Sequence, residues 1–336
     1  MTERDRRAIA IWLLGCCAMV VLMMLIGAVT RLTESGLSIT EWRPIGGALP
    51  PLTEGEWQRT FDLYRQSSQY QLQNAGMSLA AFKTIFWWEY VHRLWGRLIG
   101  VVFLLPFLWF LARGRIARPV LPHLVLMFLL GGLQGFVGWW MVKSGLVGRT
   151  DVSQYRLVAH LGMALLILGY MLWIALGLLR PSQPRPAGAA PLRPFAILVL
   201  AVIGLTALAG GLVAGLDAGL TYNTWPMMDG QVVPPGYLDL DPWWLNPFEN
   251  VAAVQFHHRM LAYATVTVAL LFWLSARGQG ATVAPVHLLA GMAVLQMLLG
   301  IATLLAAVPI GLGVMHQAGA IALFCLAVWN LRAVSD

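Results

Sequence analysis

Eight apolar segments determine the kind of fold that this chain can adopt. Each is long enough to cross the roughly 30 Å hydrocarbon core of a bilayer as a helix, and they cover residues 8–30, 85–111, 119–142, 154–179, 195–215, 251–275, 282–306 and 311–333. The chain is 59% hydrophobic and only 11% charged, whereas an average soluble domain has about 25% charged residues. Its mean hydropathy is +0.71. We therefore predict an all-α integral membrane protein with eight transmembrane helices.

The distribution of charge predicts how these helices are oriented. Basic residues gather near the N-terminus, in the short connections and at the end of the last segment: Arg4, Arg6, Arg7, Arg113, Arg115, Arg118, Arg180, Arg185, Arg193, Arg277 and Arg332. The loop 216–250 has five acidic residues and no Lys or Arg. Because basic loops stay on the cytoplasmic side, we expect both termini there and the long loops 31–84 and 216–250 outside. Topology also explains the net charge of +7, so lipid is the expected partner and nucleic acid is not.

The first apolar segment follows basic residues, as in a signal peptide, but it is too long for the apolar part of one. We expect an uncleaved first helix.

Two halves of the chain repeat each other around a proline-rich linker. Residues 1–180 form the first half, 181–194 a cytoplasmic linker, and 195–336 the second half. Five residues recur 183 positions later, namely Gly27, Glu34, Gly36, Leu37 and Trp42, with Asp217 standing for Glu34. Beyond them, His92-Arg93 recurs 166 positions later, Gln134 and Gly138 recur 162 positions later, and His160 recurs 156 positions later. This pattern predicts two repeated four-helix bundles related by an axis along the membrane normal.

Four histidines occupy matching places in the repeat. They are expected about seven residues after the start of every second helix, roughly 10 Å in from the outer face, and they are His92, His160, His258 and His316. Paired imidazoles from facing helices are the usual axial ligands of a b-type heme iron. The alternatives are isolated histidines bonded to a neighbouring hydroxyl or carbonyl, and a zinc site, for which the set lacks Cys, Asp and Glu except Glu89. We predict two heme sites toward the periplasmic side.

The remaining histidines have simpler explanations. His123 and His287 lie at the cytoplasmic ends of their helices, where interfacial solvation accounts for them. His257 points about 100° away from His258 around the helix, so both cannot face one centre. We favour His258 because it matches His92.

Glu89 distinguishes the two halves. It precedes His92 by three residues and shares its helical face, whereas the second half has Gln255 at this position. A carboxylate could shuttle a proton or hold a water beside the iron, whereas an amide can only form hydrogen bonds. The alternative is an ion pair with Arg93 at i+4. The first half is therefore predicted to be catalytic and the second to hold a supporting heme.

Arg93 and Arg259 directly follow the predicted ligands. They are candidate partners of heme propionates, or interfacial anchors. Two hemes at one depth argue against a transmembrane electron wire, which needs two histidines about four turns apart on one helix.

Other sequence features limit the possibilities. No dinucleotide fingerprint and no P-loop occur, so reducing equivalents would come from an external electron donor, either another protein or the quinone pool. Residues 54–70 predict a short amphipathic helix, lying on the outer membrane surface or solvated. The three cysteines lie in apolar segments rather than loops.

Several longer motifs resemble the heme A synthase family, from about Gly27 to His316. They are Thr30-Arg31-Leu32-Thr33 with Ser35-Gly36-Leu37, Glu89 to Arg93, Gln134 to Trp139, Tyr155 to His160, Ala214 to Pro226, Asn246 to Asn250, and Leu295-Gln296 to Thr303. The family has eight helices in two four-helix repeats. The outer loops here contain no cysteine, so the chain resembles the cysteine-free branch. The absence of a transit sequence favours a bacterial inner membrane.

The resemblance implies oxidation of the C8 methyl group of heme O to a formyl group, giving heme A for a terminal cytochrome oxidase. His92 and His160 would then bracket the substrate heme, Glu89 would be the acidic residue required for the chemistry, and His258 and His316 would ligate a resident heme b. Heme O synthase, oxidase assembly factors and a second copy of the chain are the partners that the resemblance implies.

Two alternatives stay open from the sequence. One is a non-catalytic di-heme b cytochrome for electron transfer, and the other is a transporter that uses intramembrane histidines as a proton relay. The difference between Glu89 and Gln255 favours the enzyme, because an electron carrier has little need of a carboxylate beside one iron.

Overall fold

The computed structural model describes residues 1–42, 46–146, 148–179, 192–278 and 284–335. Within them the chain is helical, with no strand and one isolated β-bridge between Met228 and Gln231. Eight of the described helices are long and apolar enough to cross a membrane, as the sequence predicted. They are α1 (Glu3–Leu32), α4 (Leu79–Ala112), α5 (Leu121–Gly145), α6 (Gln154–Leu179), α7 (Leu192–Gly215), α9 (Val251–Gly278), α10 (Ala284–Leu305) and α11 (Ile310–Ser335).

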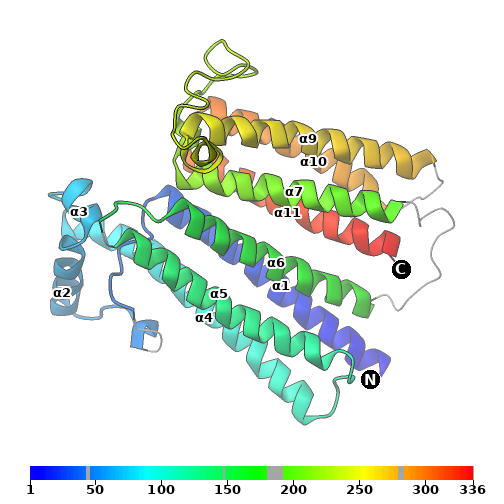
Figure 1. Cartoon of the computed structure of the whole chain (residues 1–336). Coiled ribbons are helices and arrows are strands. Elements are labelled where there is room, and N and C mark those ends of the chain that lie inside the picture. Colours follow the sequence, from blue (N-terminus) through cyan, green and yellow to red (C-terminus); the bar gives the residue numbers. More distant parts are fainter. Residues whose placement is uncertain (43–45, 147, 180–191, 279–283, 336) are drawn as a thin grey trace.

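The eight long helices lie side by side (Figure 1). In the first half α1 packs on α4, α4 on α5, α5 on α6 and α6 back on α1, while in the second half α7, α9, α10 and α11 contact each other in the same cyclic order. The two sets meet where α1 and α6 pack on α11 and α6 packs on α7. Helix α7 begins at Leu192, three residues before the predicted start of the second half. Of the expected linker, 181–191 lie outside the described residues.

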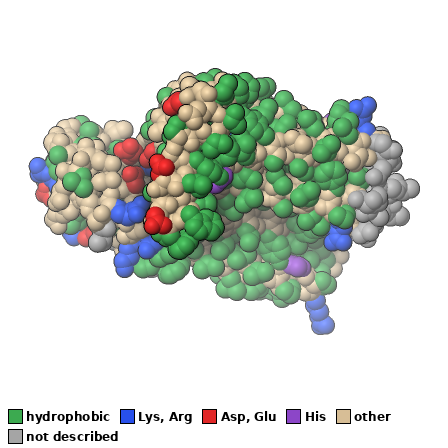
Figure 2. All heavy atoms as spheres, turned by 45° about the horizontal axis from the view of Figure 1, so that its top comes forward, with side chains coloured by type: hydrophobic (Ala, Val, Ile, Leu, Met, Phe, Trp, Pro, Cys, Tyr) green, Lys and Arg blue, Asp and Glu red, His purple; other side chains and the backbone are tan. Residues whose placement is uncertain are grey.

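The two ends of the helices differ in what they carry. Both chain termini lie at one end, and the outer segments lie at the other (Figure 1). The turn between α4 and α5 is at the end with the termini, where the Arg115 guanidinium stands 3.8 Å from the Asp5 carboxylate. Hydrophobic side chains cover most of the visible surface between the ends, and charged ones gather near the ends (Figure 2). This distribution is the one that a multi-pass membrane protein requires.

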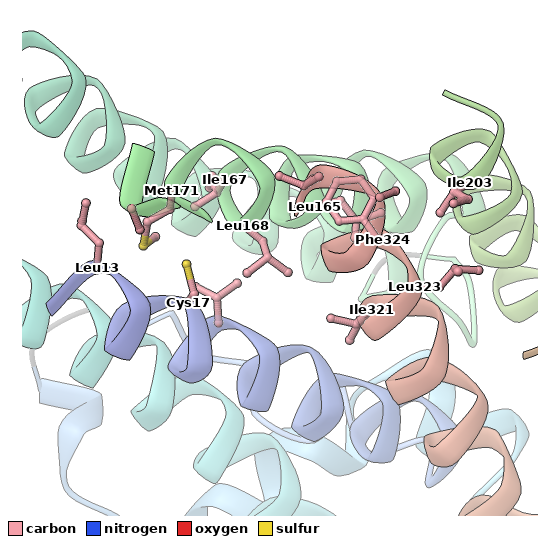
Figure 3. Packing of buried hydrophobic residues seen from close by; sticks show 14 of the residues in the cluster. Leu13, Cys17, Leu165, Ile167, Leu168, Met171, Ile203, Ile321, Leu323 and Phe324 are labelled. Carbon is pink, nitrogen blue, oxygen red and sulfur yellow. The ribbon is translucent and has the colours of Figure 1, made fainter. Parts of the chain in front are cut away.

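One apolar core joins the two halves. Leu13 and Cys17 of α1, Leu168 of α6 and Ile321 of α11 are all buried in it (Figure 3). Between α6 and α11 the fit is close, because a methyl group on Gly169 would stand 3.1 Å from the ring of a core phenylalanine, Phe324. The core therefore lies between the two sets of helices as well as within them.

A proline inside α4 creates a specific tie to α1. Pro106 has no N–H, so it cannot bond to the carbonyl of Val102 four residues earlier. The indole Nε1–H of Trp12 donates to that carbonyl at 3.0 Å instead. An unpaired carbonyl in the membrane interior is thereby satisfied by a neighbouring helix.

Helix α4 begins earlier than its hydropathy predicts. It starts at Leu79, six residues before the apolar segment, and the Ser78 side chain caps it by accepting from the Ala81 N–H. His92 consequently lies thirteen residues into its helix instead of about seven. The other three predicted ligands lie six or seven residues after their helices begin.

The additional turns of α4 support the first outer segment, which contains η1 (Gly46–Ala48), α2 (Glu54–Arg65) and α3 (Ser68–Leu72). Three aromatic side chains of α2 pack on three of α4 in one buried cluster made of Trp57, Phe61, Tyr64, Phe82, Phe86 and Tyr90. The amphipathic helix predicted over residues 54–70 is thus present as α2, which ends at Arg65 and is followed by the separate helix α3. Its apolar face packs against α4 and not against lipid or solvent. The second outer segment contains η2 (Ala218–Leu220), η3 (Trp243–Leu245) and α8 (Asn246–Glu249).

Candidate functional site

Each of the four predicted ligands lies against a glycine of the preceding long helix. A methyl group on the glycine would stand 2.8 to 3.1 Å from Cε1 of the imidazole, which is too close for an ordinary contact. The pairs are Gly27 with His92, Gly138 with His160, Gly210 with His258, and Gly300 with His316. The missing side chain is what makes room for each ring between two packed helices. These glycines recur in the sequence repeat, but their role could not be deduced without knowing which helices are neighbours.

Three of the four rings share a second property. All four histidines are at least partly accessible as residues, yet Nδ1 of His92, His160 and His258 is fully buried and has no hydrogen-bond partner. The accessible surface of these residues therefore lies on their other atoms. An imidazole held at one edge by a helix and open at the other suits axial ligation of a heme iron.

The structure brings the four histidines together as two pairs. The rings of His258 and His316 lie 6.4 Å apart between centroids and nearly perpendicular to each other. His92 and His160 occupy the equivalent places in the first half, each against its own glycine. No group of three or more His, Cys, Asp or Glu side chains that could hold a metal ion occurs among the described residues. Two imidazoles per site fit a heme better than they fit zinc, which takes three or four protein ligands.

Two glutamines stabilise the helices that carry the ligands. Gln134 Nε2 donates to the backbone carbonyl of His160 at 3.1 Å, and Gln296 Nε2 lies 2.9 Å from the carbonyl of His316 and 3.1 Å from its Nδ1. Neither glutamine was predicted as a site residue. The only indication in the sequence was that they recur in the repeat, 162 positions apart.

Glu89 is buried, with 2% of its surface exposed, and both carboxylate oxygens are occupied. Oε2 accepts from the Ser38 hydroxyl and from the Ile39 N–H, each at 2.7 Å. Oε1 accepts from Arg93 Nε at 3.0 Å and Nη2 at 2.5 Å. The ion pair that the sequence left as an alternative is therefore present, and the carboxylate also binds the segment that follows α1.

Gln255 and Arg259 bind the second outer segment in a related way. Gln255 Nε2 donates to the carbonyls of Ala218 and Thr221, and its Oε1 accepts from Arg259 Nη2 at 3.0 Å. The two arginines differ at Nε. The Nε of Arg93 donates to Glu89, whereas the Nε of Arg259 is buried without a partner. The two arginines thus hold outer segments, and the Nε–H of Arg259 stays available for a further acceptor.

The other three histidines have partners of their own. His257 Nε2 bonds to the Tyr237 hydroxyl at 2.7 Å, and His123 Nδ1 bonds to the Tyr170 hydroxyl at 2.5 Å. His287 Nδ1 accepts from the Trp273 indole at 2.8 Å. His257 also lines an apolar cavity of about 760 Å³ between α6, α7 and α9, which none of the four paired histidines lines. The structure therefore separates His257 from His258, as predicted.

Comparison with known proteins identifies the family. A family model described as cytochrome oxidase assembly protein matches residues 10–328. The chain belongs to this family. The match runs from α1 to α11 and so includes both histidine pairs.

Curated relatives of this chain carry the name heme A synthase. One from Rhodospirillum centenum is 56% identical over 330 residues, which cover 97% of this chain and 88% of the relative. One from Parvibaculum lavamentivorans is 50% identical and covers 99% of this chain and 96% of the relative. One from Nitrosospira multiformis is 49% identical and covers 96% and 92%.

Proposed function

We propose that this chain is a heme A synthase that oxidises the C8 methyl group of heme O to a formyl group. The observation that carries the proposal is the pair of matched histidine sites in a chain about half identical to proteins named heme A synthase. The product would be heme A for a cytochrome oxidase.

The four histidines divide into two roles in this proposal. His92 and His160 would hold the substrate heme, while His258 and His316 would hold a resident heme b. A bound heme supplies the redox chemistry through its iron, and the chain supplies imidazoles at fixed positions. The glycine contacts limit how each ring can turn, and the two glutamines hold the helical turns that carry His160 and His316.

Glu89 is the polar residue that we propose is required at the first site. It is three residues from His92 on the same helical face, and its hydrogen bonds attach the outer segment to that face. Arg259 is proposed as a partner of a heme propionate because its buried Nε has no partner. The Nε of Arg93, in contrast, already donates to Glu89 Oε1.

We propose a bacterial inner membrane as the location, with both termini cytoplasmic and the histidine pairs toward the periplasm. Support comes from the charge distribution, since α4 and α5 are joined by a basic turn at the end that carries the termini. The two four-helix sets are proposed to be structural repeats. The same cyclic order of helix contacts and the four equivalent glycine–histidine contacts support this. An external electron donor, heme O synthase, oxidase assembly factors and a second copy of the chain are proposed partners.

Heme extraction and chromatography test the proposal. Protein purified from cells that make heme O should contain heme B together with heme A. Glu89→Ala should keep heme B but hold heme O or a hydroxylated intermediate, and His258→Ala should lose heme B. Equal amounts of heme B alone in wild type and Glu89→Ala would instead support the di-heme electron carrier, and protein without any heme would support a transporter.

A further inference from the structure

The two outer segments that follow α1 and α7 are held by the same arrangement of hydrogen bonds from an arginine to backbone carbonyls. Arg93 Nη2 donates to the carbonyl of Ile39 and its Nη1 to that of Glu41. Arg259 Nη2 donates to the carbonyl of Tyr222 and its Nη1 to that of Thr224. The two pairs of carbonyls are 183 positions apart, the same offset as in the sequence repeat. The same nitrogens therefore hold equivalent backbone atoms in both halves.

The backbone of the two segments also agrees where they begin. Glu34 has φ of 53° and its equivalent Asp217 has φ of 51°. Residues other than glycine seldom adopt this left-handed conformation, so its occurrence at both places indicates the same turn. The arginine contacts and the turn are therefore the same in both halves. The residue that differs is Glu89 in the first half and Gln255 in the second.

The changed residue meets opposite hydrogen-bonding groups in the two halves. Glu89 Oε2 faces two donors, the Ser38 hydroxyl and the Ile39 N–H. Gln255 Nε2 faces two acceptors, the carbonyls of Ala218 and Thr221. Toward the arginine, both residues present an oxygen. An amide at position 89 would place its N–H₂ either against the Arg93 guanidinium or against the Ile39 N–H, because an amide has only one acceptor end.

We propose that Glu89 is a positioning residue, whose carboxylate holds residues 35–42 beside the His92 site, and that the hydrogen-bond polarity of this segment is what requires an acid there. The inference rests on the proposed function only for the identity of the heme. The segment starts directly after α1, whose Gly27 contacts His92, so displacing it disturbs the wall of the first site. A buried donor left without an acceptor is costly, and Glu89→Gln would leave at least one.

Hydrogen exchange in residues 35–42 tests the inference without reference to activity. Glu89→Gln and Glu89→Ala should both speed exchange in this segment by at least about tenfold, since charge-assisted hydrogen bonds are lost. Ser38→Ala should speed it by a smaller factor. Gln255→Glu is the matched control, because it should speed exchange in residues 218–224 and leave 35–42 unchanged.

Turnover of Ser38→Ala separates positioning from direct proton transfer. This variant keeps the carboxylate, so a proton-transfer role predicts unchanged conversion of heme O, whereas positioning predicts reduced conversion with an unaltered pH profile. Unchanged exchange in residues 35–42 of Glu89→Gln, together with lost conversion, would overturn the inference. If Glu89→Gln does not fold, exchange and conversion in Ser38→Ala decide alone. A wild type that makes no heme A would refute the proposed function but leave the exchange result valid.

Discussion

Gly300 on α10 lies directly against the imidazole of His316 on α11, so that a methyl group on the glycine would stand 2.8 Å from Cε1. Real side-chain contacts are longer than this, and packed interiors resist added volume by about 1–3 kcal/mol per overpacked site. A larger residue at position 300 must therefore move the ring or separate the helices.

Gly300→Val should lower the heme b content of the purified protein to less than half, measured by the absorbance of extracted heme per protein. The control is Gly291→Val on the same helix, where no heavy atom lies within 4 Å of the added carbon, and it should keep its heme. In the first half, Gly27→Val should lower bound heme O or heme A and spare heme b. Loss of both hemes in either variant would mean that the glycines support folding in general.

Gln296→Leu should weaken retention of heme b about fivefold, because one hydrogen bond to the turn that carries His316 is worth about 1 kcal/mol. Gln134→Leu should have the corresponding effect on the first site. Repeated washing in detergent followed by heme chromatography measures both. Equal retention in Gln296→Leu and wild type would show that packing alone fixes His316.

Arg31→Met should destabilise the folded protein by about 1–2 kcal/mol, the scale of hydrogen bonds to charged groups. The Arg31 side chain is 15% exposed, and its guanidinium pairs with Asp151 at 3.0 Å and with Asp217 at 2.7 Å. It therefore connects α1 to the loop between α5 and α6 and to the segment that follows α7. Thermal unfolding followed by circular dichroism measures the loss. Arg59→Met, whose pair with Glu41 is largely exposed, should change stability by less than about 0.5 kcal/mol.

Trp12→Phe should destabilise the protein by about 1 kcal/mol, the usual scale of an interhelical hydrogen bond in a membrane. It removes the donor to the Val102 carbonyl. Adding Pro106→Ala should recover part of this loss, since an alanine at this position has an N–H that can bond to the same carbonyl. Thermal unfolding of both single variants and the double variant provides the comparison. Additive losses would contradict the proposed compensation.

Phe82→Ala should release α2 and α3 from α4. The Phe82 side chain is fully buried, with ring centroids 5.0 Å from Phe61 and 5.2 Å from Tyr64, and truncating a buried Phe costs about 3–5 kcal/mol. Hydrogen exchange in residues 54–72 should rise strongly, whereas heme b content should not change. Leu72→Ala, which alters an exposed side chain, should leave exchange in α2 as it is.

Hydropathy predicted the eight long helices because a membrane span must be apolar over its whole length, and the repeat predicted which histidines are equivalent. The early start of α4 could not be predicted in this way. Lys83 and Thr84 interrupt the apolar pattern, and the helix continues through them because Ser78 caps it and α2 packs on Phe82. The packing depends on contacts distant in sequence.

Of the hydrogen-bond partners of Glu89, only Arg93 could be predicted from the sequence. The i+4 spacing to Arg93 indicated one of them, since this spacing is fixed by the helix. Ser38 and Ile39 lie about fifty positions away in a loop, and nothing in their residue types indicates that they meet a carboxylate. Gly27 and His92 each recur in the sequence repeat, but nothing in the sequence indicated that the two are in contact.

The core between α1, α6 and α11 also determines whether either half of the chain could stand alone. A free four-helix unit made of residues 192–335 would expose the face of α11 on which Phe324 packs against Gly169. Neither half is therefore self-sufficient, because each covers core residues that the other would leave uncovered if it were produced alone.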